Sequence, residues 1–166
     1  MKNKVNKEKA YSVITKLCIV LIICAIGVCL YTSIELPESA TLNISIIVVL
    51  ALSLIIAYIF SPKTIELNDT VLTLHRVAGK IRIPLENIKE VRPYYQSGIR
   101  LFGSGGLFGN FGVFTNHDIG RHYEYVGDFS EAFLVVLKSG RKYVFSCENS
   151  NKVIEQITQQ YPALKK

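Results

Sequence analysis

The segment LCIVLIICAIGVCLYTSIELPESATLNISIIVVLALSLIIAYIF, residues 17–60, divides this chain of 166 residues in two. It holds two apolar runs, Leu17–Tyr31 and Leu42–Phe60, and neither run contains a charged residue. A helix needs about 20 mostly apolar residues to cross a bilayer, so the second run is close to spanning length. The first run reaches that length together with its neighbours. We therefore predict a transmembrane helical hairpin over residues 17–60, with spans at about 13–34 and 42–60.

The charges beside these runs predict their orientation. Five Lys against one Glu make residues 1–16 net +4, whereas the link between the runs carries Glu35 and Glu38 and no Lys or Arg. Lys and Arg collect on the cytoplasmic side of membrane helices. We therefore expect a basic cytoplasmic N-terminus at residues 1–16, with both termini on the cytoplasmic side. A cleaved signal peptide is the competing interpretation, but no small-residue cleavage site follows the first run and a second run comes at once.

Residues 61–166 have the pattern of one small β-rich soluble domain. Pro62 ends the second apolar run, because proline cannot continue a helix. Alternation of apolar and polar residues predicts seven short strands, over Thr64–Leu67, Val71–Arg76, Lys80–Pro84, Ile88–Tyr95, Arg121–Val126, Ala132–Lys138 and Arg141–Ser146. An amphipathic helix is expected over Glu148–Tyr161, capped by Asn149 or Ser150 and stopped by Pro162.

The stretch Gly98–Asn116 interrupts this alternation with glycines between leucines and phenylalanines. It is expected to be an apolar loop or a bent hairpin, whose glycines relieve crowding. Its spacing gives neither G-x-G-x-x-G nor a glycine-rich loop followed by G-K-[ST], which argues against a nucleotide site. The side chains of the stretch then pack on the core, enter the membrane or bind a partner. The four phenylalanines concerned are Phe102, Phe108, Phe111 and Phe114.

Short strands followed by one helix are typical of a pleckstrin-homology-like (PH-like) domain. The chain resembles the bacterial PH-like domains of small membrane proteins in three blocks: TIEL at 64–67, IRIPLENIKEV at 81–91 and SGRKYVFS at 139–146. The resemblance covers roughly residues 61–161. It implies a membrane-anchored α+β protein of the bacterial inner membrane, with the soluble domain in the cytoplasm. That domain, residues 61–166, would hold about seven antiparallel strands in a bent sheet plus a C-terminal helix.

The same resemblance suggests where a ligand would bind. Basic residues of an early hairpin often grip phosphorylated lipid headgroups in the PH family. Lys80 and Arg82 resemble the core of that pattern, with Arg76 beside them, and Arg100 is a further candidate from the Gly-Phe stretch. Each positive charge near an anionic leaflet contributes about 1 kcal/mol of attraction.

Other chemistries find little support in the residue pattern. His117, Asp118 and His122 are too few for a metal site, because such sites bring three or four ligands together. Cys147 is the one cysteine outside the apolar runs, so no disulfide framework is expected. The soluble part carries only a modest basic excess, which argues against nucleic acid as a partner. We expect no catalytic residues, no metal and no cofactor.

The pattern thus favours a non-enzymatic module, tethered to the inner leaflet, that binds a protein partner, anionic lipid headgroups or both. Two other hypotheses stay open. The chain could be a small subunit of a membrane transporter or enzyme complex, although its apolar runs contain none of the ionisable residues that mark such activity. It could also be a sensor of envelope stress, with the hairpin reporting the state of the membrane.

Overall fold

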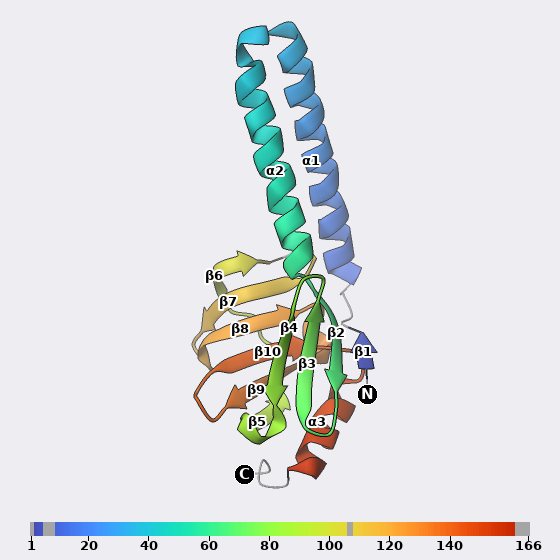
Figure 1. The fold of residues 1–166 in the computed structure, drawn as a ribbon, viewed down its shortest axis with the longest axis vertical. Coiled ribbons are helices and arrows are strands. Elements are labelled where there is room, and N and C mark those ends of the chain that lie inside the picture. The colour runs from blue at the N-terminus through green and yellow to red at the C-terminus, as the bar shows by residue number, and fades with distance from the viewer. Residues whose placement is uncertain (1, 5–8, 106–107, 162–166) are drawn as a thin grey trace.

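The computed structural model describes residues 2–4, 9–105 and 108–161 (Figure 1). Two long helices, α1 (Lys9–Glu35) and α2 (Ala40–Phe60), run antiparallel and are joined by a 3₁₀ turn at Pro37–Ser39. The segments Lys16–Glu35 and Pro37–Phe60 are long and apolar enough to cross a membrane. The two predicted helices are therefore present, and each extends beyond the span predicted for it.

A polar contact ties the two helices together beside their connecting turn. The side-chain amide of Asn43 donates to the hydroxyls of Thr32 and Ser33 over 3.0 and 3.1 Å. In an apolar environment a polar side chain needs such partners, because an unsatisfied amide there costs several kcal/mol, on the order of 4. The contact therefore holds the hairpin closed at this end.

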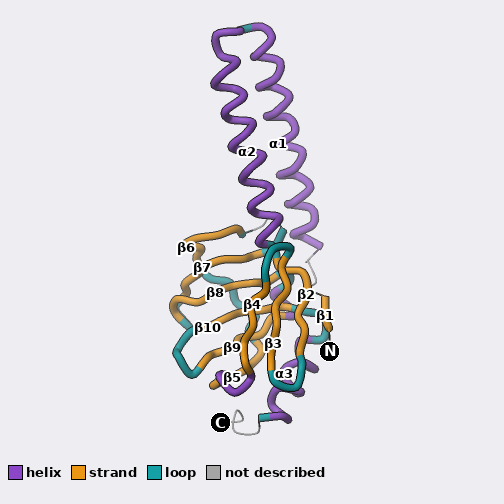
Figure 2. The backbone as a smooth tube through the Cα atoms, in the orientation of Figure 1, coloured by secondary structure: helices purple, strands orange, loops and turns teal. Residues whose placement is uncertain are grey.

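The rest of the described chain forms two sheets, one α-helix and two short 3₁₀ helices at Leu85–Asn87 and Phe129–Glu131 (Figure 2). A four-stranded sheet has the order β1-β2-β3-β4, with β1 (Lys2–Lys4), β2 (Pro62–Leu67), β3 (Val71–Arg76) and β4 (Lys80–Pro84). A six-stranded sheet has the order β5-β9-β10-β8-β7-β6, with β5 (Ile88–Pro93), β6 (Ile99–Ser104), β7 (Asn110–Asn116), β8 (Gly120–Val126), β9 (Ala132–Leu137) and β10 (Lys142–Ser146). Helix α3 (Ser150–Gln160) ends the described chain.

This architecture confirms the expected fold class: two long apolar helices followed by a β-sheet domain with a C-terminal helix. The structure also decides between two interpretations of one segment and differs from the prediction in two details. The stretch Gly98–Asn116 is not a loop, because it contains the hairpin β6–β7, which was the second interpretation offered for it. Strands β8 and β10 pair in parallel, whereas all strands were expected to be antiparallel. The strands form two open sheets, and the N-terminal β1 adds to the first of them.

Glycine makes the β6–β7 hairpin possible. Gly103 and Gly112 face each other across the two strands, with φ of +119° and +132°. A Cβ on Gly103 would collide with the carbonyl oxygen of Phe111, and one on Gly112 with that of Phe102. Only glycine allows the two backbones to approach so closely. The glycine pattern that looked like a loop is therefore the requirement of a tight hairpin.

The core lies between the two sheets and is covered at one end by α3. Its largest buried side chains come from every layer, among them Leu72, Leu85, Phe133, Phe145 and Ile157. Burying a side chain of this size stabilises the fold by about 1.5–3 kcal/mol.

Helix α3 is capped differently from the prediction. The carboxylate of Glu131 accepts hydrogen bonds from the backbone N–H and the hydroxyl of Ser150, over 3.1 and 3.2 Å. Asn149, with a left-handed φ of +58°, makes no side-chain cap. A carboxylate from a distant turn thus satisfies a free N–H of the first helical turn, which sequence spacing alone does not reveal. Pro162, the predicted stop, lies outside the described residues.

The domain is attached directly to the end of α2. Only Ser61, which is buried, separates α2 from β2. The β3–β4 turn donates a hydrogen bond from Ala78 N–H to the carbonyl of Ile59 over 3.1 Å. The β6–β7 turn places the ring of Phe108 edge-on against Tyr58, with centroids 5.7 Å apart. The helices and the domain therefore meet through packed contacts on two sides of α2.

Candidate functional site

Strand β6 carries an exposed apolar surface at the end of the domain nearest the helices (Figure 1). It is the edge strand of the six-stranded sheet. Ile99, Leu101 and Phe102 are 74%, 56% and 79% exposed, although apolar side chains of this size are usually buried. Exposed apolar side chains of this kind are typical of surfaces that contact a partner or a membrane.

A large groove separates this strand from the end of α2. We call it the α2 groove; its volume is about 1010 Å³. One wall is the last two turns of α2, from Ser53 to Phe60, and the other is formed by β6, β7 and β8. Apolar side chains dominate both walls, including Ile56 of α2, Leu101 of β6 and Val113 of β7.

Arg76 projects into the α2 groove from the end of β3. It lies in phase with Leu72 and Leu74, which face the core. Arg76 is the last residue of β3, so its side chain lines the groove beyond the buried leucines. Its guanidinium carbon lies 5.4 Å from the centre of the Phe60 ring. Its Nε is buried without a hydrogen-bond partner in the part of the chain that the structure describes. A buried N–H group without a partner is costly unless a hydrogen-bond acceptor reaches it.

Two further polar groups line the same groove as Arg76. Arg100 of β6 lines the same groove, so the structure brings together two of the four basic candidates. The phenol of Tyr125 also lines it, and burial raises the pKa of this phenol while the nearby charge of Arg76 opposes the shift. The groove therefore combines apolar walls with a local positive charge.

Lys80 and Arg82 lie elsewhere. They pair with His75 and Thr73 across the β3–β4 hairpin, on the outer face of the four-stranded sheet. Alternation along β3 separates this face from the core face on which Arg76 lies. The three basic residues predicted to lie together, Arg76, Lys80 and Arg82, are thus divided between two faces of the sheet. Lys80 and Arg82, on the outer face, line a hollow together with Glu66.

The four candidate phenylalanines also have different surroundings. Phe102 is exposed on β6 and lines the α2 groove, as does the buried Phe111. Phe108 contacts α2, as described above, with a left-handed φ of +61°. Phe114 is buried in the core beside the His122 ring, with centroids 6.5 Å apart, so it is not available to a partner.

Comparison with known proteins assigns the soluble part to a family. The model of a family described as "bacterial PH domain" matches residues 63–161, more than half of the chain. This protein belongs to the bacterial PH domain family. Searches of curated proteins and of solved structures returned no match. PH-like domains are generally non-catalytic.

Among the described residues, the PH domain contains a buried polar cluster around His122, which the sequence analysis had grouped with His117 and Asp118 and not with Glu124. His122 and Glu124 of β8 have fully buried side chains, and Nε2 of His122 lies 2.9 Å from Oε1 of Glu124. The same oxygen accepts the backbone N–H of Gly98 over 2.9 Å. Nδ1 of His122 donates to the carbonyl of Gly120 over 2.7 Å. The cluster ties the start of β6 to β8 and so has a structural role. His117 and Asp118, predicted beside it, are both exposed.

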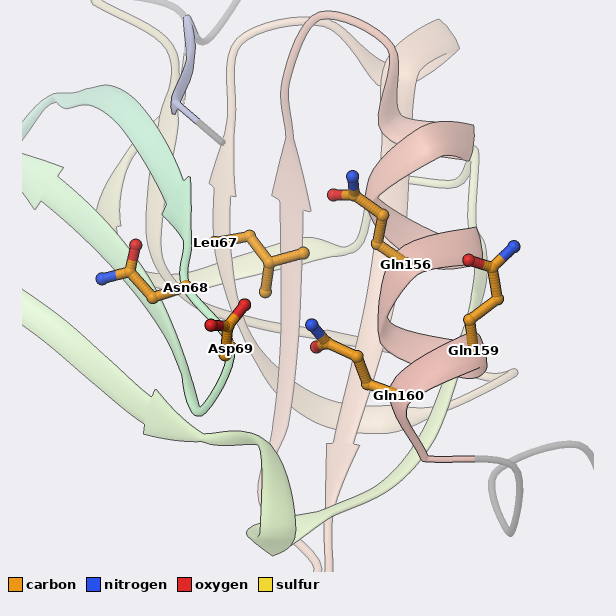
Figure 3. A pocket seen from close by; sticks show the side chains of 6 residues that line it. All are labelled: Leu67, Asn68, Asp69, Gln156, Gln159 and Gln160. Carbon is orange, nitrogen blue, oxygen red and sulfur yellow. The ribbon is translucent and has the colours of Figure 1, made fainter.

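A second hollow lies at the far end of the PH domain, between the β2–β3 turn and α3 (Figure 3). Its volume is about 290 Å³, and its lining is rich in side-chain amides. The six residues that line it are Leu67, Asn68, Asp69, Gln156, Gln159 and Gln160. The β2–β3 turn and α3 lie at the end of the domain away from α1 and α2 (Figure 1), so a ligand there would be remote from the α2 groove.

Proposed function

We propose that this protein is a non-catalytic PH module of the bacterial inner membrane that binds anionic lipid headgroups at the cytoplasmic leaflet. Helices α1 and α2 anchor it, with both termini and the domain in the cytoplasm. The observation that carries the proposal is the exposed apolar strand β6 at the end of the domain from which the helices emerge.

The direct attachment of the domain supports this reading. With α2 crossing the bilayer and only Ser61 before β2, the end of the domain that carries β6 must lie close to the headgroups. Exposed Leu101 and Phe102 then enter the apolar side of the interface, where full burial of such a side chain contributes about 1.5–3 kcal/mol. Arg100, which precedes Leu101, and the basic residues 1–16 add attraction to an anionic surface.

The charge distribution supports the orientation. The link at the other end of the hairpin carries Glu35 and Glu38, and the basic N-terminal segment returns to the domain, where β1 pairs with β2. Both basic parts therefore lie at one end of the hairpin and the acidic link at the other, as the preference of Lys and Arg for the cytoplasmic side requires.

A tryptophan reporter tests the proposal, because the chain has no tryptophan of its own. Phe102→Trp places one on β6, and Gln160→Trp places a matched, exposed control at the far end of the domain. Each full-length variant is reconstituted in phosphatidylglycerol-containing vesicles with lipids brominated on their acyl chains. We expect strong quenching of the tryptophan at position 102 and little at 160. If the tryptophan at position 102 is quenched as little as the one at position 160, contact between β6 and the bilayer is refuted. That result would favour a protein partner for β6.

A further inference from the structure

We infer that the α2 groove holds one molecule of anionic phospholipid, whose phosphate lies against Arg76 and whose acyl chain follows the wall formed by α2 and β6. The inference rests on the proposed function, because the groove meets lipid only if the end of the domain that carries β6 lies on the bilayer. It goes beyond that function in replacing a general attraction to the leaflet with one bound molecule at a defined place.

The position of the groove identifies its occupant as a lipid. One wall is part of an apolar helix that is long enough to span a membrane, and the other is the exposed strand β6. Ile56 and Phe102, one on each wall, are both more than half exposed. If α2 crosses the bilayer, a molecule can enter between these walls from the leaflet without crossing water.

Arg76 supplies the polar end of the site. Its buried Nε has no hydrogen-bond partner among the described residues. None of the ion pairs found among those residues involves its guanidinium. A phosphate fits this position well, because a guanidinium donates two parallel hydrogen bonds to phosphate oxygens. A bound anion would therefore supply the hydrogen-bond acceptor that the described residues do not provide for Nε of Arg76.

The lining of the groove matches an anionic amphiphile in charge. Arg100 adds a second guanidinium, and the phenols of Tyr123 and Tyr125 can donate further hydrogen bonds. No acidic residue is found among the described residues that line the groove. The remaining lining is largely apolar, which suits a hydrocarbon chain and not a free inorganic ion.

Size is consistent with the same occupant. Sites for small ligands occupy roughly 300–1,000 Å³, and the α2 groove lies at the upper limit of that range. By contrast, the outer hollow that contains Lys80 and Arg82 measures about 200 Å³ and includes Glu66 in its lining. That hollow is smaller and partly neutralised, so it provides the natural control.

Native mass spectrometry of the full-length protein, released from detergent micelles, tests the inference. The protein is titrated with phosphatidylglycerol, with phosphatidylethanolamine and with glycerol phosphate, which has the anionic group but no acyl chain. The test variant is Arg76→Gln combined with Arg100→Gln. The control variant, Lys80→Gln combined with Arg82→Gln, removes the same charge from the outer face of the other sheet.

We expect one phosphatidylglycerol bound to the wild-type protein and to the control, and a loss of about tenfold or more in the test variant, as for a lost charge-assisted hydrogen bond. Glycerol phosphate should bind at least about tenfold more weakly than the lipid, because it leaves the apolar walls empty. Equal losses in the test and control variants would overturn the inference, because they would show a general charge effect. Binding of glycerol phosphate as tight as that of lipid would also overturn it.

The single variant Arg100→Gln guards against misfolding, because Arg100 is exposed and its replacement leaves the core intact. It should weaken lipid binding at an unchanged melting temperature, and unchanged lipid binding in both this variant and the double variant would contradict the inference. The result can be separated from the tryptophan experiment. Quenching at position 102 without a bound lipid would refute the lipid site and leave the proposed function standing, whereas absence of quenching would refute the proposed function.

Discussion

Replacement of the buried Glu124 by glutamine should destabilise the PH domain strongly. Oε1 of Glu124 accepts the backbone N–H of Gly98 over 2.9 Å and lies at the same distance from Nε2 of His122. A carbonyl can only accept, so Nδ1 of His122 must donate to Gly120, and Nε2 is the ring nitrogen that faces Oε1 of Glu124. Glutamine can present at this point either the donor that a neutral His122 needs or the acceptor that Gly98 needs, but not both.

The magnitude follows from burial. The side chains of His122 and Glu124 are both 0% exposed. Glu124→Gln therefore breaks a buried pair and leaves one buried hydrogen-bonding group without a partner. Breaking such a pair costs about 3–5 kcal/mol, and leaving one buried donor unsatisfied costs about 1–3 kcal/mol. These two estimates describe the same loss, so we expect the free energy of unfolding to fall by about 3 kcal/mol.

The chain offers a matched control. Glu66 accepts from His75 over 2.8 Å, a pair of the same chemistry and length, but the side chains of Glu66 and His75 are 34% and 20% exposed. Solvent-accessible pairs contribute about 0–1 kcal/mol, so Glu66→Gln should lower the free energy of unfolding by less than about 1 kcal/mol.

Urea unfolding of the full-length protein in detergent micelles measures both variants, with near-ultraviolet circular dichroism of the tyrosines reporting the domain. With a denaturant slope of about 1.5 kcal/mol per molar, Glu124→Gln should lower the midpoint by about 2 M. Hydrogen exchange should show faster exchange of the Gly98 amide in Glu124→Gln only. Similar midpoints for the two variants would refute the reasoning that burial decides the contribution of these pairs.

Three further predictions concern the helix cap, the hairpin and the groove. Glu131→Ala should destabilise the domain by about 1 kcal/mol in thermal unfolding, because Ser150 loses its cap, whereas the exposed control Glu155→Ala should change it little. Gly103→Ala should open the β6–β7 hairpin and speed the exchange of its backbone amides. The control Gly105→Ala should not, because a Cβ there meets only ordinary contacts. Equal amide exchange in the two variants would contradict the close approach of the two strands at Gly103. The pKa of Tyr125 is raised by burial, so its stabilising contribution is complete below the unfolded pKa of about 10 and is lost as pH rises through the folded pKa. Tyr125→Phe should therefore reduce the alkaline loss of stability, and an unchanged pH profile would contradict this.

Local pattern was sufficient for the main elements. Runs without charge predict α1 and α2, because a helix in an apolar environment needs only length and composition. Period-two alternation predicts strands such as β3 and β4, and the block Ile81–Val91 carries the family resemblance that the family match confirms. The same alternation already places Arg76 in phase with Leu72 and Leu74, and this was the available signal that it lies on the core face, apart from Lys80.

The sequence by itself thus determined the hairpin, the family of the domain and most of the strands, because each of these depends on residues close together in the chain. Only the tertiary structure decided that β6 is an edge strand, that Glu131 caps α3 and that Arg76 and Arg100 share a groove with α2. Sheet order and strand register come from pairing between segments that are distant in the sequence. Local periodicity predicts that a segment is a strand but does not predict which other strand it pairs with. The site depends on such pairing: its two arginines are 24 positions apart in the sequence and line one groove.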